Sequence, residues 1–328
     1  MKVLVTGATS MLGGAVAQLL RSRGDDVTVF QRRPSDLGCA EVLGSVTDRR
    51  AVEAAVAGAE VVVHAAAKVT VVGPWAEFAD TNISGTANLI DAAQAAGVQR
   101  FVYVSSPSVA HSGASLVGAP AGPADPDAAR DNYSRSKAAG ELLALAADSR
   151  DFSVIAVRPH LVWGPGDTQL IGRIVERARQ GRLAVIGSGA ALVDTTYVDN
   201  AADAIVAAAD RAGDLGGRAF VVSNGEPRPV RELLDRIVVA AGLEPTRLRV
   251  PKVVARSAGS VLERVWHQTR RADDPPITRF LAEQLSTAHW FDQRETRAAL
   301  DWQPEVSLDA GFEWVSAWFR AFPVSGQR

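Results

Sequence analysis

Two features of the sequence predict an α/β protein built around a doubly wound parallel sheet. In the first half of the 328-residue chain, short apolar runs alternate with helix-length amphipathic stretches, as strands and their crossover helices do. The first run starts at the N-terminus and leads into a glycine-containing turn, TGATSMLGG. We therefore expect a Rossmann-type domain over residues 1–166. Glycines and prolines then interrupt the alternation, which predicts a smaller, mixed C-terminal region over 167–328, with some segments returning to the first domain.

Length and apolar character separate the expected strands from the expected helices. Strands are expected over residues 2–6, 27–31, 42–44, 60–64, 101–105 and 154–158. Helices are expected over 12–23, 49–56, 78–96 and 133–147, and glycines that commonly end helices follow the first three: Gly24, Gly58 and Gly97. The segment 112–131 is rich in Gly, Ala, Pro and Asp, so we expect a long surface loop near the functional site.

Composition and charge exclude several classes of protein. The chain is 47% hydrophobic and 22% charged, and its net charge of -2 gives no basic surface that would attract nucleic acid. Cys39 is the single cysteine, which excludes an internal disulfide, and the five histidines lack the spacing of a metal site. We expect a reducing, cytoplasmic compartment, no metal, and a small organic molecule as the partner.

The apolar runs are too short and too often interrupted for a membrane span. We expect no secretory signal, and no stretch of about 18 apolar residues is free of charge. Peripheral contact with a membrane stays open for residues 253–271, which combine apolar side chains with Arg256, Arg264, Arg270 and Arg271. A helix that covers the functional site is the alternative interpretation of this segment.

Gly7 and Gly13 lie in the turn that leaves the first strand and opens the first helix. Unpaired backbone N–H groups and the helix dipole favour an anion at such a turn, and a pyrophosphate is the expected ligand. Ser10 occupies the middle glycine position of the usual Gly-x-x-Gly-x-x-Gly pattern. A purely structural turn is the alternative, but the placement between strand and helix predicts a dinucleotide site.

The end of the second strand bears on which dinucleotide is bound. An NAD enzyme normally offers an acidic residue to the adenosine ribose here, whereas this chain reads Gln31, Arg32 and Arg33. Two guanidinium groups suit a 2'-phosphate, so we expect NADP(H) in preference to NAD(H). The alternative is that both arginines are merely solvated.

Tyr133 and Lys137 open a predicted helix and lie one turn apart on one face. A phenol with a pKa near 10 is a poor acid or base at neutral pH, and we expect the lysine to lower that pKa. Such a pair is common on helices, so its neighbours decide the interpretation. The strand FVYVSSPSV places Ser105, Ser106 and Ser108 at the carboxyl edge of the sheet, where open α/β sheets bind ligands.

The sequence resembles the extended short-chain dehydrogenase/reductase family over essentially its whole length. Six motifs carry the resemblance: TGATSMLGG, VVVHAAA, DTNISGT, FVYVSSPSV, YSRSK and VRPHLVWGPGD. The resemblance implies that Ser106 orients and polarises a carbonyl group and that Tyr133 donates or accepts the proton. It also implies that Lys137 binds the nicotinamide ribose and tunes the phenol, and that Asn82 supports a proton relay.

The resemblance also implies a set of cofactor contacts. Ser45 stands where the family often has an aspartate that binds adenine, so Ser10 and Ser45 are departures that bear on cofactor affinity. His160 is expected beside the nicotinamide, either as a packing or carboxamide contact or as a catalyst. The implied cofactor-binding residues are Gly7, Thr9, Ser10, Met11, Leu12, Gly13, Gln31, Arg32, Arg33, Ser45, His64, Ala65, Ala66, Tyr133, Lys137, Pro159 and His160.

Val193 bears on the substrate. Family members that act on nucleotide sugars usually have an arginine at the start of a segment like LVDTTYVDN, where it binds the diphosphate, and Val193 stands there in this chain. Unpaired phosphate charges would cost several kcal/mol, which favours an apolar substrate.

Other motifs resemble the 3β-hydroxysteroid dehydrogenase-like branch, and most closely the 2-alkyl-3-oxoalkanoate reductases of bacterial long-chain olefin biosynthesis: VVHAAAKVTVVGPW, SSPSV, RPHLVWGPGDTQL and AHWFD. This implies NADPH-dependent reduction of a 2-alkyl-3-oxoalkanoic acid to the 3-hydroxy acid. The aromatic residues that would line an acyl channel, or else simply fill the core or an interface, are Trp75, Trp163, Trp266, Phe280 and Trp290.

Other functions stay open beside the keto acid reductase. A hydroxysteroid-type or other hydroxy-compound dehydrogenase is the second, and a sugar-nucleotide epimerase or dehydratase is the third. A silent nucleotide-sensing regulator is a further alternative, but such proteins often lose the tyrosine or lysine that this chain keeps. By resemblance we also expect a homodimer through helices 78–96 and 133–147, within or outside a larger pathway assembly.

Overall fold

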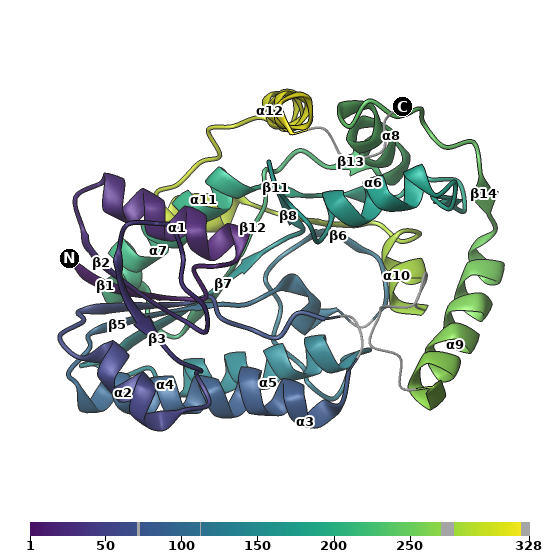
Figure 1. Ribbon diagram of the computed structural model, residues 1–328. Helices are drawn as coiled ribbons and strands as arrows, with labels where there is room; N and C mark the ends of the chain where they lie inside the picture. Colours follow the sequence, from purple (N-terminus) through teal and green to yellow (C-terminus); the bar gives the residue numbers. More distant parts are fainter. Residues whose placement is uncertain (71–72, 112, 270–278, 323–328) are drawn as a thin grey trace.

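A seven-stranded parallel sheet forms the centre of the computed structural model, which describes residues 1–70, 73–111, 113–269 and 279–322 (Figure 1). The strands lie in the order β3-β2-β1-β4-β5-β7-β12. The chain order reverses next to β1, and doubly wound sheets bind their ligands at such a switch point. The strands are β1 Lys2–Thr6, β2 Asp26–Gln31, β3 Ala40–Leu43, β4 Val61–His64, β5 Arg100–Val104, β7 Ser153–Pro159 and β12 Arg218–Val222.

Helices cover both faces of this sheet. Val3 and Val5 of β1 share one core with α1 (Met11–Ser22) and α7 (Val198–Leu215). Leu4, which points to the opposite face because side chains alternate along a strand, shares a second core with α2, α4 and α5. These three helices, which lie together below the sheet in Figure 1, are Arg49–Val56, Gly85–Ala95 and Asn132–Ala146.

The fold class predicted from the sequence is confirmed, and all six predicted strands lie in this sheet. The predicted helix 78–96 is a continuous helical stretch in three parts, α3 (Trp75–Ala79), the π-helical turn η1 (Asp80–Ser84) and α4. Strand β12 was not predicted, because it follows a glycine-rich stretch in the region of weak alternation. It brings a segment of the second half of the chain to the edge of the main sheet.

The second half of the chain builds a smaller region around its own core. Helices α6 (Ile171–Arg179), α8 (Val230–Ala240) and α12 (Leu308–Ala321) share this core. Two short strand pairs lie beside it, β8 (Val162–Trp163) with β11 (Thr196–Tyr197), and β9 (Val185–Ile186) with β14 (Arg249–Val250). A four-stranded sheet in the order β13-β10-β15-β6 consists of Arg228–Pro229, Leu192–Val193, His289–Phe291 and Leu116–Ala119.

Strand β6 corrects the expectation of one long loop over residues 112–131. It pairs in parallel with β15, and Leu116 lies opposite His289. β6 is stabilised by pairing with a distant segment and not by a local pattern of alternating residues, so the sequence predicted only a loop. Ser112 lies outside the described residues.

The segment 253–271, for which we expected either membrane contact or a cover over the site, forms α9 (Lys252–Thr269). It packs against α10 (Arg279–Gln284), and both helices lie well away from the main sheet in Figure 1. Three apolar side chains of α9 are more than half exposed: Val253, Val254 and Val261. Arg270, Arg271 and the side chain of Arg264 lie outside the described residues. In the described part of the chain, no helix is both long and apolar enough to cross a bilayer.

Candidate active site

The turn after β1 requires two of its glycines. Gly7 has a φ of +75°, and a Cβ there would lie 2.8 Å from the backbone of Ala66. A Cβ on Gly13 would lie 2.4 Å from the carbonyl oxygen of Gly7. Both contacts are closer than real Cβ atoms come, so the turn holds its shape only with glycine at these positions. The shape leaves the first N–H groups of α1 directed out of the sheet edge, which fits a pyrophosphate.

Ser10 replaces the middle glycine because it caps the helix. Its Oγ donates to the carbonyl oxygen of Gly7 at 2.8 Å and accepts from the amide of Gly13 at 3.1 Å. This is the usual work of an N-cap serine, which satisfies a helix N–H that has no partner within the helix. The side chain of Ser10 thus serves the turn itself, and the neighbouring implied contacts, Thr9, Met11 and Leu12, lie exposed or half-buried around it.

The end of β2 presents both cations and one unpredicted carboxylate. Arg32 and Arg33 are exposed and form no ion pair with the described residues. Gln31 is buried and donates from Nε2 to Glu41 on β3 at 3.0 Å. Hydrogen bonds from Ser35 hold the pKa of the Glu41 carboxyl below its ordinary value, so this charge is already engaged. Its signal in the sequence is weak, because Glu41 reaches Gln31 only through strand pairing.

His64 at the end of β4 joins three elements instead of projecting into the site. Its Nδ1 lies 2.8 Å from Oγ1 of Thr6 and its Nε2 lies 3.1 Å from Oγ1 of Thr86. Burial lowers the pKa of His64 to about 3, so the ring is neutral. Thr6 also accepts from the amide of Ala66 at 3.0 Å, which fixes the backbone of residues 65 and 66 against the glycine turn. Ser45 is the other departure from the family pattern, and its hydroxyl oxygen lies 2.7 Å from that of Thr47.

Ser106 and Tyr133 meet at the carboxyl edge of the sheet. Ser106 follows β5 and caps the 3-10 turn η2 (Pro107–Ala110), and Tyr133 stands in the first turn of α5, which Asp131 caps. The Oγ of Ser106 lies 3.0 Å from that of Ser108. Burial raises the pKa of Tyr133 to about 12, against the opposing effect of a hydrogen bond with Ser106. The phenol is therefore protonated at neutral pH.

Lys137 differs from the expectation that it lowers the pKa of Tyr133. Its Nζ donates to the carbonyl oxygen of Val104 at 2.7 Å and lies 4.0 Å from the centroid of the Tyr103 ring. Burial lowers the pKa of Lys137 to about 7, so at neutral pH the amine carries only part of its charge. The expected net lowering of the phenol pKa is not met, because burial destabilises the phenolate and the ammonium alike and so moves the pKa of Tyr133 upward.

Asn82 lies in the π-helical turn η1 and bridges two segments of the site. Its Oδ1 accepts from the amide of Lys68 at 2.7 Å, and its Nδ2 donates to the carbonyl oxygen of Lys68 at 3.1 Å and to Oγ of Ser136 at 2.9 Å. Ser136 in turn donates to the carbonyl oxygen of Tyr133 at 2.9 Å. Asn82 thereby holds the segment after β4 against the first turn of α5. Single π-helical turns are frequent at functional sites.

His160, implied beside the nicotinamide, lies in a group of three histidines. It follows Pro159 at the end of β7, and its Nε2 lies 3.1 Å from Nδ1 of His289 on β15. The His289 ring centroid lies 6.5 Å from that of His111, which follows η2. Sequence reasoning missed His111 and His289, because only the tertiary fold brings them to His160. Among the described residues, no set of three or more His, Cys, Asp or Glu is arranged to hold a metal ion.

The aromatic residues proposed for an acyl channel lie in separate places. Trp163 is buried in the core of the smaller region, where it stacks on Phe312 with 4.4 Å between ring centroids. Trp75 on α3 lies against the guanidinium of Arg135 on α5. Trp266 is on α9, and Phe280 is on α10 with a side chain outside the described residues.

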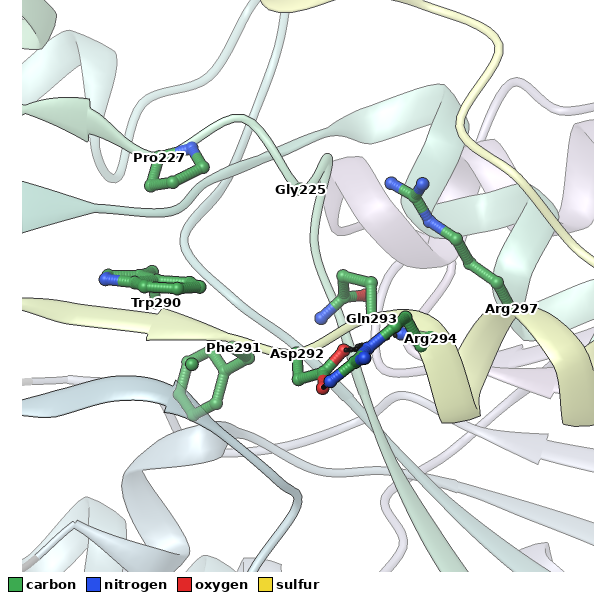
Figure 2. Close-up of a pocket in the computed structure, with 9 residues that line it drawn as sticks. Gly225, Pro227, Trp290, Phe291, Asp292, Gln293, Arg294 and Arg297 are labelled. Carbon is green, nitrogen blue, oxygen red and sulfur yellow. Dashed lines mark hydrogen bonds and ion pairs between the residues drawn. The ribbon is translucent and has the colours of Figure 1, made fainter.

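Trp290 lines a surface pocket of about 480 Å³ that does not include the catalytic residues. Figure 2 shows Trp290 and Pro227 on one side of this pocket and Arg297 directed toward Gly225 on the other. Arg294 and Asp292 form an exposed ion pair at its rim. Trp290 alternates with His289 along β15, so their side chains leave opposite faces of that strand. Phe291, which also lines the pocket, packs edge-on against His160 with 5.1 Å between ring centroids.

Comparisons with known proteins show the family to which the chain belongs. The NAD dependent epimerase/dehydratase family matches residues 3–223. A 2-alkyl-3-oxoalkanoate reductase from Stenotrophomonas maltophilia is 39% identical over 97% of this chain and 99% of its own length. A 3-beta-hydroxysteroid dehydrogenase from Mycolicibacterium neoaurum is 29% identical over 92% of this chain and 87% of its own length. The solved structure of MoeE5 in complex with UDP-glucose and NAD has a TM-score of 0.75 and 25% identity, covering 98% of this chain and 99% of that one.

The chain belongs to the NAD dependent epimerase/dehydratase family, whose members are the extended short-chain dehydrogenases/reductases. It is an oxidoreductase of the nicotinamide-dependent type that acts on CH–OH groups. Within the family it is similar to proteins named 2-alkyl-3-oxoalkanoate reductase, including a second one from Shewanella oneidensis that is 35% identical over 95% of this chain and 85% of its own length.

Proposed function

We propose that this protein is an NADPH-dependent reductase that converts a 2-alkyl-3-oxoalkanoic acid into the 2-alkyl-3-hydroxyalkanoic acid, in the cytoplasm and in the biosynthesis of long-chain olefins. The observation that carries the proposal is the pairing of Ser106 with a protonated Tyr133 at the carboxyl edge of the sheet. Full-length similarity to proteins named for this reaction supports the choice of substrate.

Separate residues bind the cofactor, orient the substrate and donate the proton. Gly7, Gly13 and the N-terminus of α1 bind the pyrophosphate of the cofactor, which when bound supplies a hydride to the ketone carbon. Ser106 donates a hydrogen bond to the ketone oxygen and orients it toward Tyr133. The phenol then donates its proton to that oxygen, and a pKa of about 12 keeps the proton in place until charge develops on the substrate.

Lys137 and Asn82 support this proton transfer through their contacts with the cofactor and with α5. The Lys137 ammonium binds the cofactor ribose and stabilises the phenolate that forms as Tyr133 gives up its proton. Asn82 keeps α5 in place through Ser136, which bonds the backbone of Tyr133 itself. Replacement of Tyr133 by phenylalanine tests the assignment: NADPH still binds, measured by its fluorescence, and turnover falls by about 100-fold or more. A phenylalanine variant with normal turnover would overturn the role of the phenol.

Arg32 and Arg33 support the preference for NADPH. Both guanidinium groups are exposed and make no ion pair with the described residues, while the Glu41 carboxylate accepts hydrogen bonds from Ser35 and Gln31. The pair therefore offers its charge to a 2'-phosphate. Alanine at both positions raises KM for NADPH about 10-fold or more and leaves KM for NADH nearly unchanged. Equal changes for the two cofactors contradict this preference.

Val193 supports a substrate without a diphosphate. Its side chain is buried in the core of the smaller region. Arg228, its partner across the β10–β13 pair, already forms ion pairs with Glu226 and Glu232. Loss of NADPH absorbance with a racemic 2-alkyl-3-oxoalkanoic acid tests the proposal, with a 3β-hydroxysteroid plus NAD and a UDP-sugar as comparison substrates. Turnover of either comparison substrate without turnover of the keto acid overturns it.

We also propose a homodimer formed through α4 and α5. These helices lie below the sheet in Figure 1, and Leu142 of α5 is 45% exposed although it is apolar. Light scattering of the purified protein tests the dimer, and replacement of Leu142 by glutamate shifts the mass toward that of the monomer if α5 forms the interface. A protein that is monomeric at all concentrations contradicts the proposal.

A further inference from the structure

The three histidines at the carboxyl edge are the feature that the proposed mechanism leaves unused. His160 and His289 have ring centroids 5.0 Å apart, and both rings are almost fully buried, as is that of His111. His111 closes the 3-10 turn that begins directly after Ser106, and the amide of Ser105 binds β7 two residues before Pro159. The group is therefore attached to the same two segments, η2 and the end of β7, that flank Ser106.

The hydrogen bonds determine which nitrogen of each ring carries the proton. Nε2 of His289 lies 2.8 Å from the carbonyl oxygen of Gln284, which can only accept, so this nitrogen is the donor. In the neutral ring Nδ1 of His289 is then an acceptor, and Nε2 of His160 must donate to it. Neutral rings are expected, because burial lowers the pKa of His289 to about 4 and that of His160 well below its ordinary value.

Two buried nitrogens of opposite character remain. Nδ1 of His160 is an acceptor once Nε2 donates to His289, and it has no partner among the described residues. Nδ1 of His111 accepts from the amide of Gly113 at 3.2 Å, so Nε2 of His111 is a donor. The backbone of Ala114 lies near this ring, but no acceptor in the described part of the chain forms a hydrogen bond with Nε2. Buried polar atoms without partners are rare in native proteins, since each costs free energy that a hydrogen bond would recover. Both nitrogens belong to rings close enough to interact electrostatically, so together they offer a ligand one donor and one acceptor.

We propose that His111 and His160 form a carboxyl-binding subsite that receives the acid group of the 3-oxo acid substrate. One donor and one acceptor complement a carboxylic acid, whose carbonyl accepts from His111 and whose hydroxyl donates to His160. The same contacts hold a carboxylate when its proton resides on Nδ1 of His160, because the bond from His160 to His289 is unchanged. This inference rests on the proposed function, since it assigns the recognition of that same substrate.

The chemistry of the substrate fits this placement. In a 3-oxo acid a single carbon separates the carboxyl group from the ketone carbon, so the two groups must bind close together. Ser106, which would hold the ketone oxygen, and His111, which would hold the acid, stand at the two ends of one short helical turn. The two recognition groups thus flank one rigid four-residue segment, Pro107–Ala110.

The charges around the group permit an acid to bind. Glu283 faces His111, and its carboxylate lies 3.2 Å from Arg256 and 3.8 Å from Arg130. Arg130 also faces His111, while His160 otherwise faces the other two rings and the backbone of Asp194. The two arginines carry two positive charges and Glu283 carries one negative charge, so a substrate carboxylate does not meet a net negative charge.

The carboxamide of the nicotinamide ring also offers one donor and one acceptor, so the experiment must separate it from the substrate acid. Two substrates do this, the 2-alkyl-3-oxoalkanoic acid and the ketone that remains when its carboxyl group is removed. Two variants complete the design, His111→Leu, which removes the donor, and His111→Gln, whose Nε2 stands near the position of the lost nitrogen. The measurements are kcat/KM for each substrate and the Kd of NADPH.

The wild-type protein is expected to favour the acid over the ketone by about 10-fold or more in kcat/KM. His111→Leu removes most of that preference by lowering the value for the acid, with the ketone and the Kd of NADPH nearly unchanged, and His111→Gln restores it. Equal wild-type values for acid and ketone overturn the subsite even if the leucine variant does not fold. A weaker Kd for NADPH in the leucine variant assigns the group to the carboxamide and also overturns it. A wild-type protein that reduces neither compound shows instead that the proposed function is wrong.

Discussion

The ion pair between Arg158 and Glu141 gives a quantitative test of what holds the catalytic edge together. Both side chains are 1% exposed, and the guanidinium binds both carboxylate oxygens, through Nε at 2.9 Å and through Nη2. The same guanidinium donates from Nη1 to the carbonyl oxygens of Ala121 and Gly122. It therefore joins β7, α5 and the segment that leads toward Tyr133.

Replacement of Arg158 by methionine leaves the Glu141 carboxylate buried without its partner. Breaking a buried pair in this way costs about 3–5 kcal/mol of unfolding free energy. That is a large part of the roughly 5–15 kcal/mol that stabilises a typical protein. The double variant, with methionine at 158 and leucine at 141, has no buried charge, so we expect it to regain half of the loss or more. Full recovery is not expected, because the carbonyl groups of residues 121 and 122 still lose their donor.

Urea unfolding followed by circular dichroism measures these differences as shifts in midpoint at constant m-value. The two single variants, the double variant and the wild type complete a cycle that isolates the coupling between the side chains. A single variant that loses less than about 1 kcal/mol, or a double variant as unstable as the single one, would refute the account of the buried charge.

Three further predictions concern the cofactor turn and the titrating groups. Gly13→Ala weakens NADPH binding at least 10-fold in a fluorescence titration, because the new Cβ would lie 2.4 Å from the oxygen of Gly7; unchanged binding contradicts the tight turn. The kcat for ketone reduction decreases as the pH rises above about 7, where Lys137 loses the charge that stabilises the phenolate, and a flat profile from pH 6 to pH 9 contradicts this role. The unfolding free energy falls as the pH drops from 6.5 toward about 3, because in this range His64 is protonated in the unfolded chain and stays neutral in the folded protein. Urea midpoints that do not change between pH 7 and pH 4.5 contradict this prediction.

The features that the sequence predicted well are those written in consecutive residues. Apolar runs alternating with helical stretches located six of the seven strands of the main sheet, and glycines with positive φ end the first helices, as at Gly24 and Gly58. Ser106 and Tyr133 were predicted to act together because each stands where a motif leaves a strand or opens a helix; the structure joins their side chains, and their catalytic roles stay predictions. Features that depend on distant pairing were missed, including β6, β12 and the meeting of His111 with His289.

Burial was the other quantity that sequence could not supply. A lysine one helical turn from a tyrosine predicts a lowered phenol pKa, but the interior position of both groups moves the pKa of Tyr133 up and that of Lys137 down. Ser10 shows the same limit at a smaller scale. In the sequence Ser10 is only a departure from the glycine pattern. Its hydrogen bonds to Gly7 and Gly13 identify it as the N-cap of α1.

The pairing of β6 with β15 also has a consequence for the order in which the protein folds. Leu116 and His289 can meet only after nearly the whole chain has been synthesised, and closing so long a loop is entropically costly, so this contact forms late. The main sheet, by contrast, can begin to assemble from neighbouring segments as they emerge. A nascent chain would thus form the glycine turn after β1 first and the group of three histidines last, so an incomplete chain could fold its main sheet before His289 joins His160.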